Sequence, residues 1–390
     1  MVHKVDNITE ILLGAIRAQV CGDEYIINRV ISDEEMEKLY FLSKSQDMAH
    51  IVCAELDKQG LLKDNEIGAK FRKQMMLSIF RYERINYELE QVCRVLEAAK
   101  IPHIPLKGAV MRKYYPEPWM RTSSDIDILV KPENIDGASN ALSVSLNYTQ
   151  KGSTPHDISL FSPSGVHLEL HFDTVEERRA NNSKNILDNI WDYAVSNGNG
   201  NYTYELCDEM FYFYHIAHMA KHFEASGCGL RFFLDMWLLN RDKSNIEKRN
   251  KLLEDGKLLK FAVSSEELSS VWFSKTAHSS VSKCMEEYIL RGGIYGSADN
   301  NITTQRIHTG SKLKYTLGLI FLSYDKMRIR YPSLNKKLLL PFYQVRRWFS
   351  LIFRGKTKRS INTLKRGTSL SQEQKDSVAS MLKELGLISL

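Results

Sequence analysis

Long apolar runs are missing from this 390-residue sequence. A membrane-spanning helix needs about 20 consecutive apolar residues. The nearest candidates, residues 315–324 and 338–353, are shorter, and the second is interrupted by Pro341, Arg346 and Arg347. The first residues, MVHKVDNITEILLGA, lack a basic segment followed by an apolar one. The sequence therefore predicts neither a transmembrane helix nor a signal peptide.

Paired cysteines are also missing. The six cysteines are scattered singly and form no CxxC pair. This pattern excludes a disulfide framework and a cysteine zinc site, and it is typical of a reducing compartment. We therefore expect a cytoplasmic protein.

Acidic residues are absent from residues 326–366, which hold thirteen Lys and Arg, although the whole chain carries a net charge of only +6. Within this segment, residues 338–353 mix aromatic and aliphatic side chains with arginine. Three interpretations are open: an interfacial membrane helix, a polyanion-binding surface, or a packed helix with a solvated basic tail. Packing is the commonest of these. Membrane contact ranks above nucleic-acid contact because apolar bulk accompanies the charge and no nucleic-acid-binding motif does.

The periodicity of apolar residues divides the chain into four parts. Residues 1–100 are predicted to be helical, 101–175 to form a small α/β unit with a mixed sheet, 176–330 to be helical, and 331–390 to form a basic amphipathic segment with a terminal helix. The expected fold class is α+β, with a small mixed-sheet core flanked by N-terminal and C-terminal helical regions.

The boundaries of individual elements follow from caps, turns and periodicity. Strands are predicted at 125–130, 148–151, 157–161 and 166–172. Residues 291–310, with four glycines, are predicted to be a flexible loop. Helices are predicted at 7–20, 33–59, 67–100, 109–115, 132–146, 208–224, 230–241, 244–261, 265–290, 312–328 and 369–390.

The strand at 125–130 begins with Asp125-Ile-Asp127. Side chains alternate faces along a strand, so Asp125 and Asp127 point the same way. Two adjacent carboxylates repel each other unless a cation lies between them, as at a Mg²⁺ site. The alternative is an exposed strand end with two solvated acids.

A third carboxylate is available in the run Val166-His-Leu-Glu-Leu-His171. Alternation places His167, Glu169 and His171 on one face of this strand and the aliphatic residues on the other. Glu169 could complete a three-carboxylate site of the kind that phosphoryl-transfer enzymes use. An edge strand with a wet face would give the same pattern.

These residues resemble the signature of the uncharacterised nucleotidyltransferase-like family, which belongs to the DNA polymerase β-type nucleotidyltransferase superfamily. The resemblance extends from about residue 100 to 350, and residues 1–66 and 370–390 carry none. The runs that carry it are Leu106-Lys-Gly108, Tyr115-Pro116, Arg121, Ser124–Val130, Glu169-Leu-His171, His215–His222, Leu230-Arg231, Asp235 and Tyr331–Arg346.

The resemblance implies transfer of a nucleoside monophosphate from an NTP to an unidentified acceptor, with Mg²⁺ or Mn²⁺ and release of pyrophosphate. It implies that Asp125 and Asp127 bind both metal ions, and that Glu169 binds the catalytic ion and helps activate the acceptor. Lys107 and the backbone of Gly108 would approach the triphosphate.

The sequence departs from the superfamily at Ala109, where a serine hydroxyl would be expected after the glycine. Lys107, Ser123 or Ser124 could replace that hydroxyl. The departure keeps open the alternative of a non-catalytic nucleotide-binding or scaffold protein of a biosynthetic complex, located in the cytoplasm or at a membrane surface. A phosphotransferase using the same carboxylates is a further alternative.

Further polar residues are candidates for the walls of the site. Arg121 either contacts a phosphate or pairs with an acid. His215, His218 and His222 share one helical face with Lys221 nearby. No cysteine or carboxylate has a matching ligand spacing, so zinc is not predicted. With His171 they line a substrate cleft, or they pack inside the helical region. Arg231 and Asp235, four residues apart, are predicted to pair.

Overall fold

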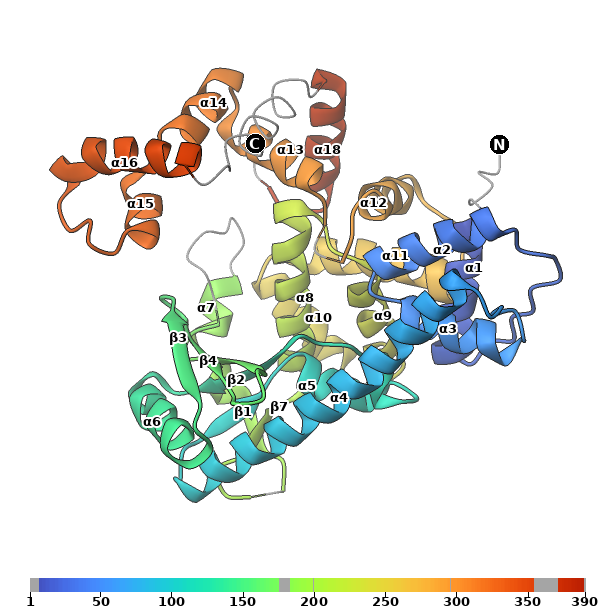
Figure 1. Ribbon diagram of the computed structural model, residues 1–390, viewed down its shortest axis with the longest axis horizontal. Coiled ribbons are helices and arrows are strands. Elements are labelled where there is room, and N and C mark those ends of the chain that lie inside the picture. The colour runs from blue at the N-terminus through green and yellow to red at the C-terminus, as the bar shows by residue number, and fades with distance from the viewer. Residues whose placement is uncertain (1–6, 175–182, 199, 295, 354–370, 389–390) are drawn as a thin grey trace.

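The computed structural model describes residues 7–174, 183–198, 200–294, 296–353 and 371–388 (Figure 1). The part of the predicted basic segment at 354–366 lies outside the described residues. In the part of the chain that is described, no helix is long and apolar enough to cross a membrane.

A five-stranded mixed sheet carries the polar strands that the sequence singled out. Its spatial order is β1-β2-β5-β4-β3, and only the central β2–β5 pair is parallel. The small mixed sheet among helices confirms the α+β fold class. The strands are β1 (His103–Pro105), β2 (Asp125–Val130), β3 (Thr149–Ser153), β4 (Asp157–Phe161) and β5 (His167–His171).

The apolar face of this sheet has its own core. Ile126 and Ile128 of β2 and Leu168 and Leu170 of β5 are almost fully buried there. They pack with residues of the long helix α4 (Glu66–Ala98) and of α6 (Ile135–Leu146). Because side chains alternate along a strand, the acids lie on the opposite face of the sheet. That face lies toward α8 (Asp208–Ser226).

The N-terminal helices are α1 (Asn7–Ile16), continued by a π-helical turn at Arg17–Cys21, then α2 (Asp33–Ser45), α3 (Ala49–Lys58) and α4. The Ser32 side chain caps α2 in a capping box with Glu35. The prediction of one helix over 33–59 was wrong. Asp47 adopts a left-handed conformation (φ 57°), which ends α2 before α3 begins.

In the described residues after 182, the regular structure is helical apart from one small hairpin, β6 (Ala194–Ser196) and β7 (Tyr204–Leu206), which the sequence did not predict. Short 3₁₀ turns lie at Arg112–Tyr114, Pro118–Met120, Pro132–Asn134, Ile190–Tyr193 and Lys337–Leu339. The remaining helices are α5 (Gly108–Met111), α7 (Ser183–Leu187), α8, α9 (Leu230–Leu239), α10 (Ile246–Asp255), α11 (Leu259–Ser274), α12 (Ser280–Leu290), α13 (Ala298–Thr309), α14 (Lys312–Ile320), α15 (Tyr324–Arg330), α16 (Leu340–Phe353) and α18 (Gln372–Glu384).

Several predicted segments of this part of the chain were wrong. The predicted helix 244–261 is broken at 256–258, and α11 continues through the break that was predicted at 262–264. The residues predicted as a loop at 291–310 include helix α13, which Ser297 caps through the backbone N–H of Asn300. The predicted helix 265–290 is interrupted after Lys275, which is left-handed (φ 57°). The predicted helix 312–328 is divided into α14 and α15.

One large core joins both ends of the described chain. Residues of α1–α3 are buried together with residues of α8–α12 and with the apolar face of α18. Figure 1 shows α8 between the sheet and the N-terminal helices α1–α3. Helices α14–α16 extend away from the rest of the molecule at the upper left. The polar face of the sheet therefore meets a helical wall.

Candidate active site

The three predicted carboxylates come together because β2 and β5 are parallel neighbours. Asp127 lies directly across from Glu169, and Asp125 lies across from His167. Two groups of side chains have ligand atoms within 4.8 Å of one another: Asp125 with His167 and Glu169, and Asp127 with Glu169 and His171. Glu169 belongs to both groups and links them into one cluster.

Asp127 is the most buried of the three acids, with about 5% of its surface exposed. Its Oδ1 accepts hydrogen bonds from Lys107 Nζ at 2.6 Å and from His171 Nε2 at 2.9 Å. Burial alone would raise the pKa of Asp127, but the charge of Lys107 and the bond from His171 outweigh it and lower that pKa. Asp127 is therefore held as a carboxylate.

Asp125 is in the opposite situation. Its pKa is raised by burial and then by the negative charges of Asp127 and Glu169. The pKa of Glu169 is lowered, first by its hydrogen bond from His171. The cluster thus holds more negative charge than its own lysine and histidine neutralise, which is the condition under which a divalent cation binds.

Lys107 reaches this cluster from an unusual backbone conformation. Its φ of 46° and ψ of −118° are rare for a residue with a side chain. Burial lowers the pKa of Lys107, but Asp127 reverses that effect and the pKa is raised, so the ammonium stays charged. Such strain persists only where surrounding contacts fix it, and it is concentrated at functional sites.

Gly108 follows and lies against Ser123. A Cβ at Gly108 would come within 2.9 Å of the Ser123 Cβ, so only glycine allows this approach. The Ser123 hydroxyl accepts a hydrogen bond from the Arg112 guanidinium. Burial, followed by the charge of Arg121, lowers the pKa of Arg112 to about 10. Ser123 therefore supplies a fixed hydroxyl beside Gly108, while Ser124 is exposed.

A cavity of about 400 Å³ is lined by the three acids, His171 and all the other predicted site residues. The sheet side includes the three acids and His171. The opposite side is formed by α8 and the start of α9. The lining residues from the prediction are Lys107, Gly108, Arg121, Ser123, Ser124, Asp125, Asp127, Glu169, His171, His218, Lys221 and His222.

The histidines of α8 face the cavity and also pack. His215 Nε2 lies 3.1 Å from the carbonyl oxygen of Phe232, and the rings of His218 and His222 are 4.6 Å apart. Burial, then the charge of Lys107, lowers the pKa of His218 well below its usual value. His218 is therefore a neutral imidazole. Among the described residues, the clusters with metal-binding geometry are those of the sheet, and these three histidines do not form one.

The sequence of this chain matches one known protein family. A family described as "Uncharacterised nucleotidyltransferase" matches residues 32–273, more than half of the chain. The chain belongs to this family. Searches of curated proteins and of solved structures gave no match.

The extent of the family match differs from the resemblance seen in the sequence. It begins at residue 32 and so includes α2 and α3, in which no resemblance had been recognised. It ends at residue 273, before the stretch at 331–346 that had been included. The matched residues therefore include α2 and α3 together with the residues that line the cavity.

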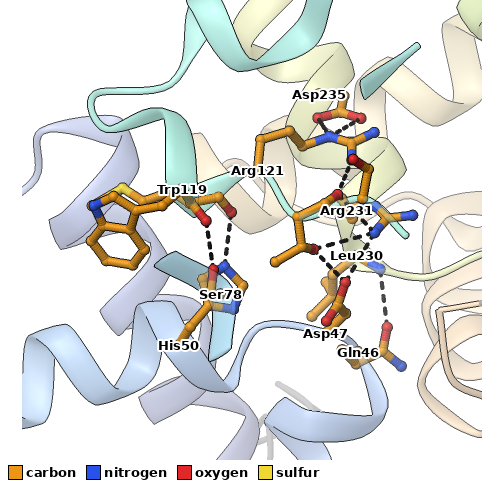
Figure 2. Close-up of polar contacts among 12 residues, drawn as sticks. Gln46, Asp47, His50, Ser78, Trp119, Arg121, Leu230, Arg231 and Asp235 are labelled. Atoms are coloured by element: carbon orange, nitrogen blue, oxygen red, sulfur yellow. Dashed lines mark hydrogen bonds and ion pairs between the residues drawn. The ribbon is translucent and has the colours of Figure 1, made fainter. Parts of the chain in front are cut away.

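A buried polar network beside the cavity joins these parts of the chain, as Figure 2 shows. The Nε of Arg121 donates to both carboxylate oxygens of Asp235, at 2.7 and 2.9 Å. Tyr115 also donates to Asp235, at 2.7 Å. Arg231 donates to Asp47 at 2.9 Å. Arg121 therefore ties the segment before β2 to α9, and Asp47 ties α2 to the same helix.

The predicted pairing of Arg231 with Asp235 was wrong. Each residue instead pairs with a partner more than 100 residues away, Arg231 with Asp47 and Asp235 with Arg121. Arg121 does pair with an acid, but with Asp235 and not with an acid of the cluster. Its predicted contact with a phosphate remains a prediction.

Several residues in or beside the site were not predicted as part of it. His167 had been placed on the correct face but was left out, although it belongs to the Asp125 group. Its Nε2 lies 2.6 Å from the Ser159 hydroxyl on β4. Tyr214 and Phe232, both buried, complete the wall opposite the acids. For Tyr214 the available signal was its position one turn before His218 on the same helix.

Proposed function

We propose that this protein transfers a nucleoside monophosphate from an NTP to an acceptor, with divalent metal ions and release of pyrophosphate. The observation that carries the proposal is the register of β2 and β5, which places Asp125, Asp127 and Glu169 side by side at the cavity. Membership of a nucleotidyltransferase family supports it.

The donor set fits Mg²⁺ or Mn²⁺. Both are hard cations that prefer carboxylate oxygens, and the ligand atoms lie close enough to share an ion. Asp125, Asp127 and Glu169 would hold the ions. When bound, such ions stabilise charge on the attacking and leaving oxygens of an in-line displacement.

The protein's own side chains bind the phosphates and activate the acceptor. Lys107 carries a fixed positive charge beside Asp127, where it neutralises phosphate oxygens. The Ser123 hydroxyl donates to a phosphate oxygen next to Gly108. On the acceptor side Glu169, ionised because His171 lowers its pKa, takes the proton of the attacking hydroxyl. The oxygen–phosphorus bond to the acceptor forms as the bond to pyrophosphate breaks.

Ser123 also bears on the alternative of a non-catalytic binding protein. That alternative rested on Ala109, where a phosphate-binding hydroxyl was expected. Ser123 lies against Gly108 and has its hydroxyl fixed by Arg112, so the hydroxyl is supplied from another position. This supports the enzyme over the scaffold. The phosphotransferase alternative is distinguished by its leaving group, a nucleoside diphosphate in place of pyrophosphate.

Nucleotide binding tests the proposal without knowledge of the acceptor. Isothermal titration of the four NTPs in Mg²⁺ or Mn²⁺ should show binding to the wild type. Asp125→Asn/Asp127→Asn should weaken it by more than about 100-fold, since changes even to outer partners of metal ligands cost 10–100-fold. Lys113→Ala, a half-exposed residue next to the same segment, serves as the control. Equal affinities in the wild type and the double variant would defeat the proposal.

The two serines give a finer prediction. Ser123→Ala should weaken NTP binding by about 10-fold, because it removes a hydrogen bond to a charged group worth about 1.5–3 kcal/mol. Ser124→Ala, next to it but exposed, should leave the affinity unchanged. Titration of both variants checks the assignment, with thermal melting to show that each is folded. A larger effect at Ser124 would reassign the hydroxyl.

A further inference from the structure

Helices α14–α16 form a small unit that extends from the body of the protein (Figure 1). Its interior combines buried apolar side chains, Met327 and Leu334, with polar contacts between the helices. Arg347 of α16 donates to the carbonyl oxygens of Ile320 and Leu319, both at 2.8 Å. Gln344 donates to the carbonyl of Leu322 at 2.5 Å. These bonds fix which side of α16 faces α14.

The outer side of α16 is apolar and open to solvent. Leu338 in the turn before it is 92% exposed, Phe342 is 68% exposed and Val345 is 44% exposed. Their spacing of four and three residues puts them on one helical face. On α14, Leu313 and Leu317 are also exposed and lie four residues apart. A row of exposed apolar side chains along one face of α16 is the kind of surface that marks an interaction site.

The charge around this surface has one sign. Residues 312–353 contain nine Lys and Arg and a single acid, Asp325. Several of these cations lie over aromatic rings of the unit, with Lys337 over Tyr324 and Arg346 over Tyr331 and Tyr343. A partner that matches this surface therefore has both negative charge and an apolar region into which the exposed side chains can be buried.

We propose that α14–α16 bind an anionic membrane surface, with α16 lying in the plane of the interface. Exposed Leu and Phe beside Lys and Arg are the composition of interfacial helices, in which apolar side chains enter the acyl boundary and cations contact headgroups. Two copies of so basic a surface would repel each other. A nucleic acid would match the charge and leave the aliphatic side chains in water.

Vesicle binding by the full-length protein tests this proposal. Wild type should cosediment with vesicles of phosphatidylcholine and phosphatidylglycerol, and bind pure phosphatidylcholine about 10-fold less. Added salt should weaken the binding. Leu338→Ser/Phe342→Ser should reduce it by about 10-fold or more, because the removed side chains account for the apolar burial. Lys336→Glu/Lys337→Glu should reduce it through charge alone.

The matched control is Phe41→Ser/Val263→Ser. Both are apolar side chains on helices and each is 56% exposed, but acids lie near them in the sequence, Glu37 before Phe41 and Glu266 after Val263. The control should bind like the wild type, and every variant should keep its NTP affinity. Three results would overturn the proposal: binding that ignores lipid charge, binding unchanged by Leu338→Ser/Phe342→Ser, or a surface that binds RNA or a second copy and no vesicles.

Discussion

Asp127→Asn is expected to abolish nucleotidyl transfer and destabilise the fold, whereas Asp125→Asn abolishes transfer and stabilises the metal-free fold. The two acids are two residues apart and face the same way, yet their surroundings differ. Asp127 accepts from Lys107 and His171, and its pKa is lowered despite burial. Asp125 has a raised pKa because of burial and the neighbouring negative charges. Neutralising Asp127 removes an attraction, and neutralising Asp125 removes a repulsion.

The sizes of these effects follow from the same contacts. Removing one partner of a buried ion pair costs about 3–5 kcal/mol. Because 23% of the Lys107 side chain is exposed, we expect about 3 kcal/mol for Asp127→Asn. For Asp125→Asn we expect a higher unfolding midpoint. Transfer should fall by at least about 10³-fold in both, corresponding to about 4 kcal/mol at the transition state.

Urea unfolding in EDTA, and thermal melting with and without Mg²⁺, measure the contrast. Mg²⁺ should raise the melting temperature of the wild type and leave both variants unchanged, since a bound ligand stabilises only the state that binds it. Glu205→Gln, a half-exposed acid outside the cavity, is the control. If both variants lost the same stability in EDTA, the assigned difference between the two acids would be wrong.

Strand periodicity explains why the sheet could be predicted. The bounds of β2 and β4 match the predicted 125–130 and 157–161. The alternation of Asp125-Ile-Asp127 and of His167-Leu-Glu-Leu-His171 places acids and aliphatic residues on opposite faces, because a strand has a period of two. What alternation does not give is which strands are neighbours. The closeness of Asp127 and Glu169 depends on the parallel pairing of β2 with β5.

Helix ends were harder to predict because single residues decide them. Asp47 and Lys275 end helices by adopting left-handed conformations that aspartate and lysine rarely take. At α13 the glycines before it suggested a loop, while the cap at Ser297 and the buried Ile302 and Ile307 make a helix. These outcomes depend on tertiary contacts that override local propensity.

Long-range ion pairs could not be predicted at all. Spacing of four residues favoured Arg231 with Asp235 on one helix, which is a weak interaction at a helix surface. Both residues are in fact buried, where a charge requires a close and well-oriented partner. Arg121 and Asp47, brought in by other parts of the chain, provide the partners. The spacing of residues in the sequence does not show that Arg121 and Asp47 lie next to α9 in the folded protein.

Asp235→Asn is accordingly expected to lower the free energy of unfolding by about 3–5 kcal/mol. Asp235 is fully buried and accepts from both Arg121 and Tyr115, so the change leaves a buried guanidinium without its counter-charge. Glu34→Gln, which breaks the exposed pair with Lys38, should change stability by less than about 0.5 kcal/mol. Urea denaturation of both variants measures the difference.

A double-mutant cycle then separates the structural role of Arg121 from a role in binding phosphate. Arg121→Leu/Asp235→Leu removes both charges, so it should be destabilised by less than the sum of the two single variants. If Arg121 acts by holding the segment before β2 against α9, nucleotide affinity should recover in the double variant along with stability. If stability recovers and affinity does not, Arg121 contacts the nucleotide directly. We expect the first result, because the Nε of Arg121 already donates to both oxygens of Asp235.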